Sequence, residues 1–464
     1  MRMRKAFKKL GYFWLPSAAE NKIPGTLTIL DGGEIELEAV GLFGKIEESI
    51  KDKDNLIRIV GNIEDDGLVT LEECFYKNRT IAFGGISKSM IHVHKVLSGV
   101  SYAEGDPVFL NTFSFSVEGI DEWVGISGIK SATDIENRTA TITYQEPEEI
   151  SYQLDNGMKL LISYAWTLPG FQILKEAKIT HRTFFKLTST EKKELDEFMT
   201  AARKITYLLC FAIDETVCLE NIVATSDDVK YDNGKGELRH AQIKIYYPSL
   251  PFSKEEPTIN LHKMLFKFGQ VRDNGGRVIN NWFDAYDRIS PALNLYFSTK
   301  TGGHKYLEEK FLALSQGLET YHRRTYDGKL MGDTEFKELV DGLLLQCPEE
   351  RKEWLQRRLA NANEISFGNR IKNVIKPFKE HVGTSKEREK LINNITNTRH
   401  YLTHYNEALK SQAAEGDDLW SLCIIMEAIF QLHLLQVLGF SKEEIDSILN
   451  SSYKLKQKFK EISN

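Results

Sequence analysis

Cysteine is scarce in this chain of 464 residues, and its placement follows no pattern. The five cysteines are Cys74, Cys210, Cys218, Cys347 and Cys423. Their number is odd and no two of them form a CxxC pair, which argues against a disulfide framework and against a zinc ribbon. We therefore expect free thiols in a protein of the reducing cytoplasm.

An excess of positive charge is also absent. The net charge is −6 and the pI is about 6.1, which argues against a histone-like or generally polybasic nucleic-acid binder. A local basic cleft can still lie on an acidic protein. Hydrophobic residues make up 41% and charged residues 27% of the chain, as is ordinary for a globular protein. One core rarely serves a chain of this length, so we expect two or three domains.

Long apolar runs are missing, with one exception. The basic residues 1–9 and the apolar residues 11–15 superficially resemble a signal peptide, but Pro16 ends the run below the roughly 7–15 residues that such a signal needs. Residues 419–440 are long enough to span a membrane, yet they contain polar residues that are costly in lipid. These are Glu427, Gln431, His433 and Gln436. We expect a folded first segment, a buried core helix and no membrane partner.

The first half has the two-residue period of β-strands. Residues 26–38, 108–117 and 150–165 alternate polar and apolar side chains. Asp31-Gly32-Gly33 and Asn156-Gly157 interrupt two of these segments, as the turns of β-hairpins do. The pattern predicts a β-rich domain with polar outer faces and not a parallel α/β sheet.

A helix is expected inside this half. Thr188 and Glu191 have the spacing of a capping box, and a helical pattern follows to about Phe211. A loop at 227–236 and a strand near 241–247 come next.

Helical periods dominate from about residue 277. The predicted helices cover 277–297, 304–324, 333–346, 349–361, 367–380, 386–403, 417–438 and 442–461. Ser441 and Glu444 match a second capping box, and Gly439 is placed to end the preceding helix. With few turn dipeptides and no fixed repeats, this half is expected to be an all-α bundle.

Together these patterns predict an α+β multidomain chain, in which a β-rich N-terminal half precedes an all-α helical bundle. The β-rich N-terminal domain is expected over residues 1–185, an α+β continuation over 186–275 and the all-α domain over 276–464. The turn Asn274-Gly275-Gly276 marks the last of these boundaries.

One short motif contains residue types that are suited to catalysis. The segment Arg399-His400-Tyr401-Leu402-Thr403-His404 places an arginine five positions ahead of a histidine in a helical region. Arginine stays charged at any working pH and can bind two phosphate oxygens at once. Histidine takes and gives protons near neutrality. Cleaving RNA without a metal needs both abilities, because one group must move the 2′-hydroxyl proton and a cation must offset the charge that builds on phosphorus.

The surroundings of this motif resemble a known family. Residues 311–324 (FLALSQGLETYHRR), 366–372 (SFGNRIK) and 397–405 (NTRHYLTHY) resemble the first, the middle and the catalytic helix of the ApeA-like branch of the HEPN superfamily of ribonucleases. In the first half, residues 11–16 (GYFWLP) and 25–27 (GTL) resemble the start of the β-rich N-terminal domain that accompanies this HEPN type. The resemblance covers nearly the whole chain.

This resemblance implies an abortive-infection, anti-phage protein. Its HEPN domain would cleave RNA without a metal or other cofactor, leaving a 2′,3′-cyclic phosphate. Arg399 would bind the phosphate and His404 would be the catalytic histidine. His400 stands where Asn or another polar residue is common, so its role is open, although an imidazole can donate to a phosphate oxygen. Glu319 would match a polar residue that the first helix points toward the site, and Tyr405 would be an auxiliary residue at the end of the catalytic segment.

The resemblance also implies a homodimer or a larger homo-oligomer. On an ideal helix, residues five apart are separated by about 140° around the axis, so Arg399 and His404 cannot both face one point. Either the helix ends near Thr403 and swings His404 round, or two chains share the site across a two-fold axis. The expected partners are RNA, with transfer RNA among the candidates, and an unidentified phage-derived trigger.

Other interpretations stay open at this stage. The basic and aromatic stretch 321–326, which includes Arg323, is suited to line an RNA path or to be a solvated helix end. His400 and His404 share a helical face and can bind zinc, although no glutamate lies between them in the metalloprotease pattern. The main rival function is a non-catalytic HEPN module that binds nucleotides or proteins.

Overall fold

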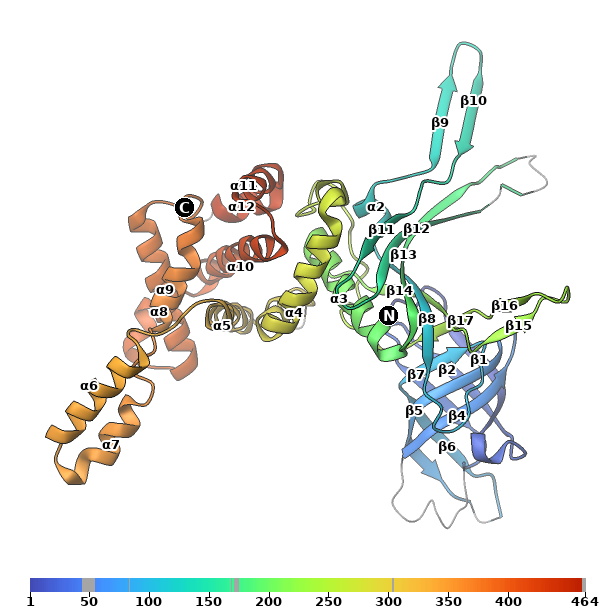
Figure 1. Ribbon diagram of the computed structural model, residues 1–464, viewed down its shortest axis with the longest axis horizontal. Helices are drawn as coiled ribbons and strands as arrows, with labels where there is room; N and C mark the ends of the chain where they lie inside the picture. The colour runs from blue at the N-terminus through green and yellow to red at the C-terminus, as the bar shows by residue number, and fades with distance from the viewer. Residues whose placement is uncertain (44–54, 83, 168, 171–174, 303, 461–464) are drawn as a thin grey trace. The chain divides into compact units, whose positions relative to one another are not determined.

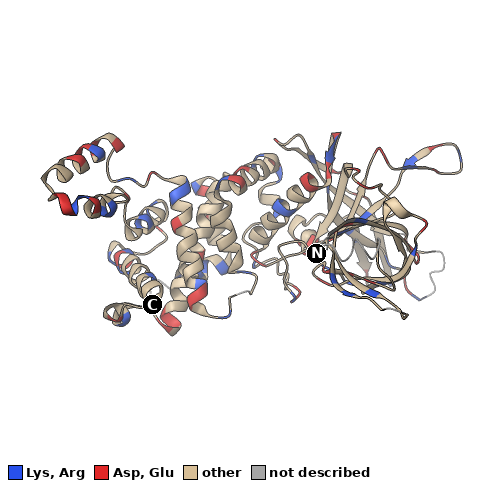
Figure 2. Ribbon diagram, turned by 90° about the horizontal axis from the view of Figure 1, so that it is seen from below, with Lys and Arg blue, Asp and Glu red and all other residues tan. Residues whose placement is uncertain are grey.

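The computed structural model describes residues 1–43, 55–82, 84–167, 169–170, 175–302 and 304–460. The chain divides into two compact units, Met1–Asn280 and Asn281–Asn464. The first is rich in strands and the second is helical (Figure 1), so the predicted fold class is confirmed. Lysine and arginine are interspersed with aspartate and glutamate in both units (Figure 2).

Six strands of the first unit form a closed barrel. They are β1 (Phe7–Trp14), β2 (Ile23–Ile29), β3 (Ile35–Ala39), β4 (Asn55–Ile63), β5 (Gly67–Thr80) and β6 (Lys88–Val93). Neighbours pair in the order β5-β4-β1-β2-β3-β6, and β6 pairs back to β5. Because side chains alternate between the two faces of a strand, Phe13, Leu27, Leu37 and Ile91 point inward and are fully buried. The hairpin predicted about Asp31-Gly32-Gly33 is the β2–β3 pair.

The sheet continues beyond the barrel through seven more strands. Outward from β5 they are β7 (Lys95–Ser98), β17 (Ile243–Tyr246), β14 (Leu219–Thr225), β8 (Phe109–Val117), β13 (Thr180–Glu194), β12 (Lys159–Thr167) and β11 (Ile150–Gln153). Helix α3, Leu195–Ile213, packs against β8 and β13, with the Phe198 ring stacked on Phe113 at 6.0 Å. The predicted hairpin about Asn156-Gly157 is the β11–β12 pair.

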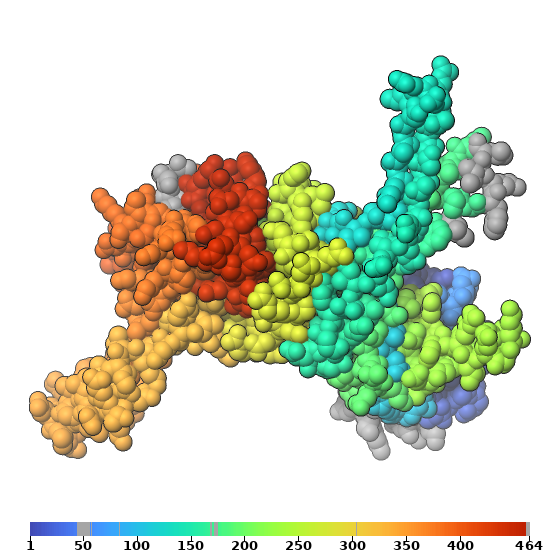
Figure 3. All heavy atoms as spheres, turned by 45° about the horizontal axis from the view of Figure 1, so that its top comes forward, coloured from blue at the N-terminus to red at the C-terminus, as the bar shows by residue number. Residues whose placement is uncertain are grey.

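Shorter elements complete the first unit. They are η1 (Pro16–Ala18), α2 (Ile120–Val124), β9 (Ile129–Asp134), β10 (Thr139–Tyr144), β15 (Lys230–Asp232), β16 (Leu238–His240), η2 (Phe268–Gln270) and η3 (Arg272–Asn274). The β9–β10 hairpin extends from the rest of this unit as an arm (Figure 3), and its strands bury no side chain.

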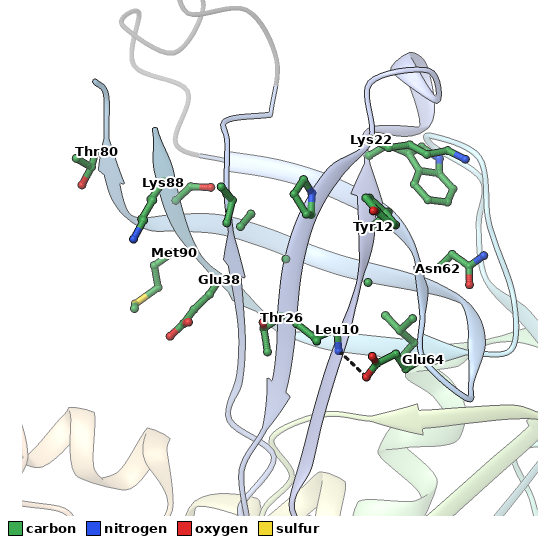
Figure 4. A pocket seen from close by; sticks show the side chains of 18 of the residues that line it. Leu10, Tyr12, Lys22, Thr26, Glu38, Asn62, Glu64, Thr80, Lys88 and Met90 are labelled. Carbon is green, nitrogen blue, oxygen red and sulfur yellow. Dashed lines mark hydrogen bonds between the residues drawn. The ribbon is translucent and has the colours of Figure 1, made fainter. Parts of the chain in front are cut away.

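The outer face of the barrel is hollowed. A cavity of about 810 Å³ lies there, and Leu10, Tyr12, Glu38 and Met90 are among the residues that line it (Figure 4). A Cβ atom on Gly25 would lie 2.8 Å from the Glu38 carbonyl oxygen, so glycine allows the close approach of β2 and β3. The lining of the cavity combines apolar side chains, such as Leu10 and Met90, with the charged side chain of Glu38.

Two predicted elements of the first unit are wrong. The helix expected from Thr188 begins at Leu195, because β13 continues to Glu194 and pairs with β8 on both sides of a bulge. Pairing between distant strands outweighs the local capping pattern here. The loop expected at 227–236 contains part of the β15–β16 hairpin.

The predicted three-part division of the chain stays a prediction. Its boundary between residues 185 and 186 falls inside β13, whose pairing with β8 and β12 continues across it. The stretch from Asn274 to Gly276 is not the expected turn, because it ends η3 and begins helix α4, Gly275–Ser298.

The segment that leads into α4 packs along β11. The Tyr152 hydroxyl donates to the Arg272 carbonyl oxygen at 2.7 Å. Asn280 Nδ2 donates to the Gln153 carbonyl oxygen at 3.3 Å. The start of α4 is thereby fixed to the last strand of the long sheet.

Helices and loops make up the described part of the second unit, apart from an isolated β-bridge between Lys329 and Glu364. After α4 the helices are α5 (Leu307–Thr325), α6 (Asp333–Gln346), α7 (Glu349–Leu359), α8 (Phe367–Ile375), η4 (Lys376–Phe378), α9 (Ser385–His404), η5 (Glu407–Gln412), α10 (Gly416–Leu438), α11 (Lys442–Ser451) and α12 (Tyr453–Lys460). The backbone of α4 leaves helical geometry at Ile289, two residues before Pro291, because proline has no amide hydrogen and its ring crowds the preceding turn.

Four of these helices pack together around the candidate site. Helix α5 contacts α8, α9 and α10, and α8 contacts α9. Gly317 of α5 allows close packing on α10, since a Cβ atom there would lie 3.0 Å from the Phe430 ring.

The end of the chain follows the predicted caps but not the predicted length. Ser441 and Glu444 form the predicted capping box of α11, and Gly439 ends α10 with φ of 92°. The single helix expected over 442–461 is broken at Ser452 into α11 and α12. Its last residue, 461, lies outside the described residues.

Among the described residues, α10 is the one helix long and apolar enough to cross a membrane, and its most apolar 18-residue window is 78% buried inside the protein. It carries the buried Glu427, whose carboxylate contacts Lys300 at 2.5 Å, Lys310 at 3.5 Å and Lys458. Burial alone would raise the pKa of Glu427, but these ammonium groups lower it well below its usual value. This burial and these ion pairs are those of a core helix, as the sequence predicts for α10.

The buried imidazole of His433 on α10 should make the fold sensitive to acid. Its Nε2 donates to the Val374 carbonyl oxygen at 2.7 Å, and burial lowers the pKa of His433 from 6.5 to about 4. The unfolded chain binds a proton here below pH 6.5 that the folded chain does not bind until about pH 4. The stabilisation is therefore complete above pH 6.5 and is lost between these two values.

We expect the free energy of unfolding of the wild type to fall by roughly 3 kcal/mol more than that of His433→Gln between neutral pH and about pH 4. Urea denaturation at a series of pH values measures this difference. The same pH dependence in both proteins would show that His433 titrates freely in the folded chain.

Candidate active site

The motif of Arg399 to His404 occupies the last turns of α9. The helix begins with a capping box, in which Thr384 Oγ1 accepts from the Glu387 amide at 3.3 Å and the Glu387 carboxylate accepts from the Thr384 amide at 2.6 Å. It ends with His404, and Tyr405 follows in the left-handed region at φ 48°. The whole motif is therefore helical.

Arg399 lies where α5, α8 and α9 meet. Its Nη2 donates to Glu319 Oε2 of α5 at 3.3 Å. Its guanidinium carbon lies 4.8 Å from the centre of the Phe367 ring at the start of α8, which is a cation–π contact. The Arg399 side chain is 30% exposed, so part of the guanidinium stays open to an anion from solvent.

Glu319 is shared by three arginines. Besides Arg399, Arg323 Nη2 lies 3.2 Å and Arg370 Nε lies 4.0 Å from Glu319 Oε1. Glu364 adds a second carboxylate, 2.6 Å from Arg323 and 2.9 Å from Arg370, and its hydrogen bond from Arg323 lowers the pKa of Glu364. We call these five residues the arginine cluster. Three guanidinium groups and two carboxylates leave it with one positive charge in excess.

A buried histidine lies behind the arginine cluster. His322 Nδ1 accepts from Arg370 Nη1 at 3.3 Å, and its ring stacks on Tyr326 at 4.9 Å. Burial, followed by the charges of Arg370 and Arg323, lowers the pKa of His322, so the imidazole is neutral at neutral pH. The stretch 321–326 is therefore not a continuous RNA-binding strip, because its first two residues are buried and Arg323 is engaged by carboxylates.

His400 faces a different side of α9. It is partly buried and lines a groove of about 750 Å³ between α8 and α9. Burial lowers the pKa of His400, and the charges of Arg399 and His404 lower it further. The imidazole is therefore neutral at neutral pH, when it can donate one hydrogen bond and accept another.

His404 and Tyr405 are exposed at the end of the helix, where the Tyr405 ring packs on Tyr401 at 5.7 Å. Helix α9 ends at His404, one residue after Thr403, and His404 keeps its helical position. Arg399 and His404 are thus separated by about 140° around the helix axis. No hydrogen bond or ion pair between described residues joins them. Within one chain, the cation and the imidazole face different sides.

No group of three or more His, Cys, Asp or Glu side chains is placed to hold a metal ion in the part of the chain that the structure describes. His400 and His404, the pair considered for zinc, belong to no such group. All five cysteines are free. The reactivity of Cys423 is low at neutral pH, because burial raises the pKa of its thiol to about 12.

Two members of the arginine cluster were not singled out from the sequence. Glu364 lies in a loop, where local pattern gives no sign of its partners. Arg370 carried a usable signal, because it shares the apolar face of α8 with Phe367, Ile371 and Val374. An arginine at such a position must be buried, and a buried guanidinium needs an anionic partner.

Loss of the shared carboxylate should destabilise the protein more than loss of the cation it holds. Glu319→Ala removes the carboxylate that three arginines share, although Glu364 still pairs with the buried Arg370, and we expect the free energy of unfolding to fall by about 2 kcal/mol. Arg399→Ala removes a partly exposed partner and should cost about 1 kcal/mol or less. Urea denaturation compares the two variants. An Arg399→Ala protein as unstable as Glu319→Ala would show that Glu319 is not the centre of the cluster.

Comparison with protein-family models gives two matches. The model described as ApeA N-terminal domain 1 matches residues 8–282, which is more than half of the chain. The model described as Apea-like HEPN matches residues 312–444 and so includes the arginine cluster and all of α9. A search of curated proteins found no match, and a search of solved structures found none either.

Proposed function

The chain belongs to the ApeA-like family, with an ApeA N-terminal domain followed by an ApeA-like HEPN domain, and from this membership we propose that it is a cytoplasmic anti-phage ribonuclease. The HEPN domain cleaves RNA, and the β-rich half senses a phage-derived trigger or restrains the enzyme. The observation that carries the proposal is the partly open Arg399 in a cluster with one positive charge in excess, on the same helix as His404.

The reaction that suits these groups is attack of a 2′-hydroxyl on the adjacent phosphorus of the RNA. His404 takes the proton of the hydroxyl, and the 2′ oxygen forms a bond to phosphorus as the bond to the 5′ oxygen breaks. The departing 5′ oxygen takes a proton from solvent. The products are a 2′,3′-cyclic phosphate and a free 5′-hydroxyl, and the step needs no metal.

Arg399 would bind the phosphate by exchanging one anion for another. In the free protein the Glu319 carboxylate occupies one side of its guanidinium. A phosphate that takes this place leaves Glu319 still paired, because Arg323 and Arg370 remain beside it. A cation held in this way needs little reorganisation when charge builds on phosphorus, which is the condition for electrostatic catalysis.

Two copies of the chain are proposed to build one cleft. Arg399 and His404 face different sides of α9, so a single helix does not direct both to one phosphate. An isologous dimer brings the arginine of one copy to the histidine of the other and creates two such pairs. His400, neutral at neutral pH, is suited to donate its N–H to a phosphate oxygen, and the exposed Tyr405 ring to stack on an unpaired base.

Removal of the proposed catalytic imidazole should slow cleavage strongly without changing the fold. Purified wild-type protein is incubated with single-stranded RNA or transfer RNA in EDTA, and His404→Ala should cleave about 10²–10⁴ times more slowly. His262→Ala, which removes an exposed histidine of the β-rich unit, is the matched control and should keep the wild-type rate. Equal cleavage by wild type and His404→Ala refutes the assignment. RNA binding without any product would favour the rival function, a non-catalytic HEPN module.

The same two variants test the defence role in cells. Cells that express wild type or His262→Ala should limit phage growth, and cells that express His404→Ala should not. Protection that persists in His404→Ala would separate defence from catalysis.

Mixing two inactive variants tests whether the site is shared. Arg399→Ala and His404→Ala should each be nearly inactive. If the site joins Arg399 of one copy to His404 of the other, a mixed dimer keeps one intact pair, and random exchange should restore about a quarter of the wild-type rate. Native mass spectrometry confirms that mixed dimers form. Mixed dimers without activity would place both residues of each site in one chain.

A further inference from the structure

The groove between α8 and α9 differs in charge from the rest of the protein. The chain as a whole is acidic, with a net charge of −6, and its charges are mixed over both units (Figure 2). The groove is lined by Ser366, Phe367, Gly368, Asn369, Lys372, Asn373, Ile375, Lys376, Lys379, Ser385, Arg388, Glu389, Ile392, Asn393, Thr396 and His400. Four of these side chains are cationic and one is anionic. The lining therefore carries an excess of positive charge even with His400 neutral.

The cations follow the length of the groove. Lys372 and Lys376 are one turn apart on α8 and its continuation η4, which corresponds to about 6 Å along the axis, and Lys379 follows. Arg388 contributes from α9 on the other side, where its guanidinium donates to the carbonyl oxygens of Lys379 at 2.9 Å and of Gly383. A row of cations at this spacing matches a chain of phosphates better than it matches one small anion.

One end of the groove reaches the candidate active site. Phe367 lines the groove and also carries the Arg399 guanidinium over its ring. His400 lines the same end and precedes His404 by one turn of α9. A polymer held in the groove is therefore led to the motif at the end of this helix.

The remaining lining suits unpaired RNA. The amides of Asn369 and Asn393 lie at exposed positions and can donate to or accept from base edges. The volume of about 750 Å³ has room for a short stretch of one strand. A solvated helical face explains exposed lysines but explains neither a hollow lined by them nor its opening at Phe367 and His400.

We propose that this groove binds the phosphate backbone of single-stranded RNA beside the scissile phosphate, with Lys372, Lys376, Lys379 and Arg388 as the phosphate-binding residues. The inference rests on the proposed function, because it names the path of the substrate into that site. The four cations bind and position the strand, and they take no part in the bond changes at phosphorus.

The experiment separates binding from cleavage by using His404→Ala as the parent protein. The probe is a fluorescein-labelled single-stranded oligoribonucleotide of mixed sequence, and its affinity is measured by anisotropy at several salt concentrations. Lys376→Ala/Lys379→Ala should raise the Kd about ten-fold and reduce the slope of log K against log salt by roughly 1.4, since each phosphate contact on a single strand contributes about 0.7.

The matched control is Lys386→Ala/Lys390→Ala. It removes the same charge from exposed positions of α9 that do not line the groove, and its Kd should stay within about two-fold of the parent. Circular dichroism and thermal melting verify that each variant is folded. Lys372→Gln, a milder change in the same groove, should raise the Kd in the same direction and serves if the double variant fails to fold.

Chains with His404 intact give the second readout. Lys376→Ala/Lys379→Ala should raise KM and leave kcat near the wild-type value. In one outcome, the wild type cleaves no RNA while the groove variants still bind the probe more weakly than the control. That result supports RNA binding in the groove and contradicts the proposed ribonuclease activity. Equal Kd values for the groove and control variants would show that the groove does not bind the RNA. A groove variant that dissociates the dimer and leaves RNA binding unchanged also contradicts the proposed RNA binding, because the groove is then a protein interface.

Discussion

The ion pairs of Glu319 are the interaction on which the helical unit builds its site. One carboxylate on α5 is approached by Arg370 of α8 and Arg399 of α9, as well as by Arg323 of its own helix. The three arginines range from buried Arg370 to half-exposed Arg323. The inner pairs are little screened by solvent, while the outer ones are exposed enough to exchange partners with anions from solvent. The buried Arg370 and the partly exposed Arg399 are thus joined through one carboxylate, that of Glu319.

This arrangement explains how an acidic protein can present a cationic site. The excess charge of the arginine cluster is local, and its cations are held by neighbours and not by flexible chain. Preorganised groups of this kind stabilise developing charge better than mobile ones, because they do not have to reorient during the reaction. The helical geometry that holds Arg399 toward α5 also directs His404 elsewhere, which is why a second copy of the chain enters the proposed mechanism.

Local patterns in the sequence were sufficient for much of the fold. Alternation identified the β2–β3 and β11–β12 hairpins, and the Ser441–Glu444 capping box began a helix where expected. The same capping pattern at Thr188 was wrong, because β13 gains cross-strand hydrogen bonds that no local window contains. Ser452 broke a helix that its period predicted as continuous.

The residues of the candidate site differ in the same way, because some were visible in the sequence and others needed the three-dimensional structure. The spacing of Arg399 and His404 was visible in the sequence, and Glu319 was placed through resemblance. Arg370 and Glu364 depend on contacts between α5, α8 and the loop before α8, so their partnership needed three-dimensional structure. The orientation of His400 into a groove depends likewise on the packing of two helices.

The anchoring of the α4 segment on β11 has a consequence for the long sheet. Its opposite end is sealed by the pairing of β6 with β5, and β11 is shielded by Arg272 and Asn280. On β11 the backbone carbonyl of Gln153 is already engaged by Asn280, so a strand from another molecule cannot pair with it there. A fragment cut before Arg272 would lose both of these contacts with β11. A fragment that keeps both contacts extends at least to Asn280.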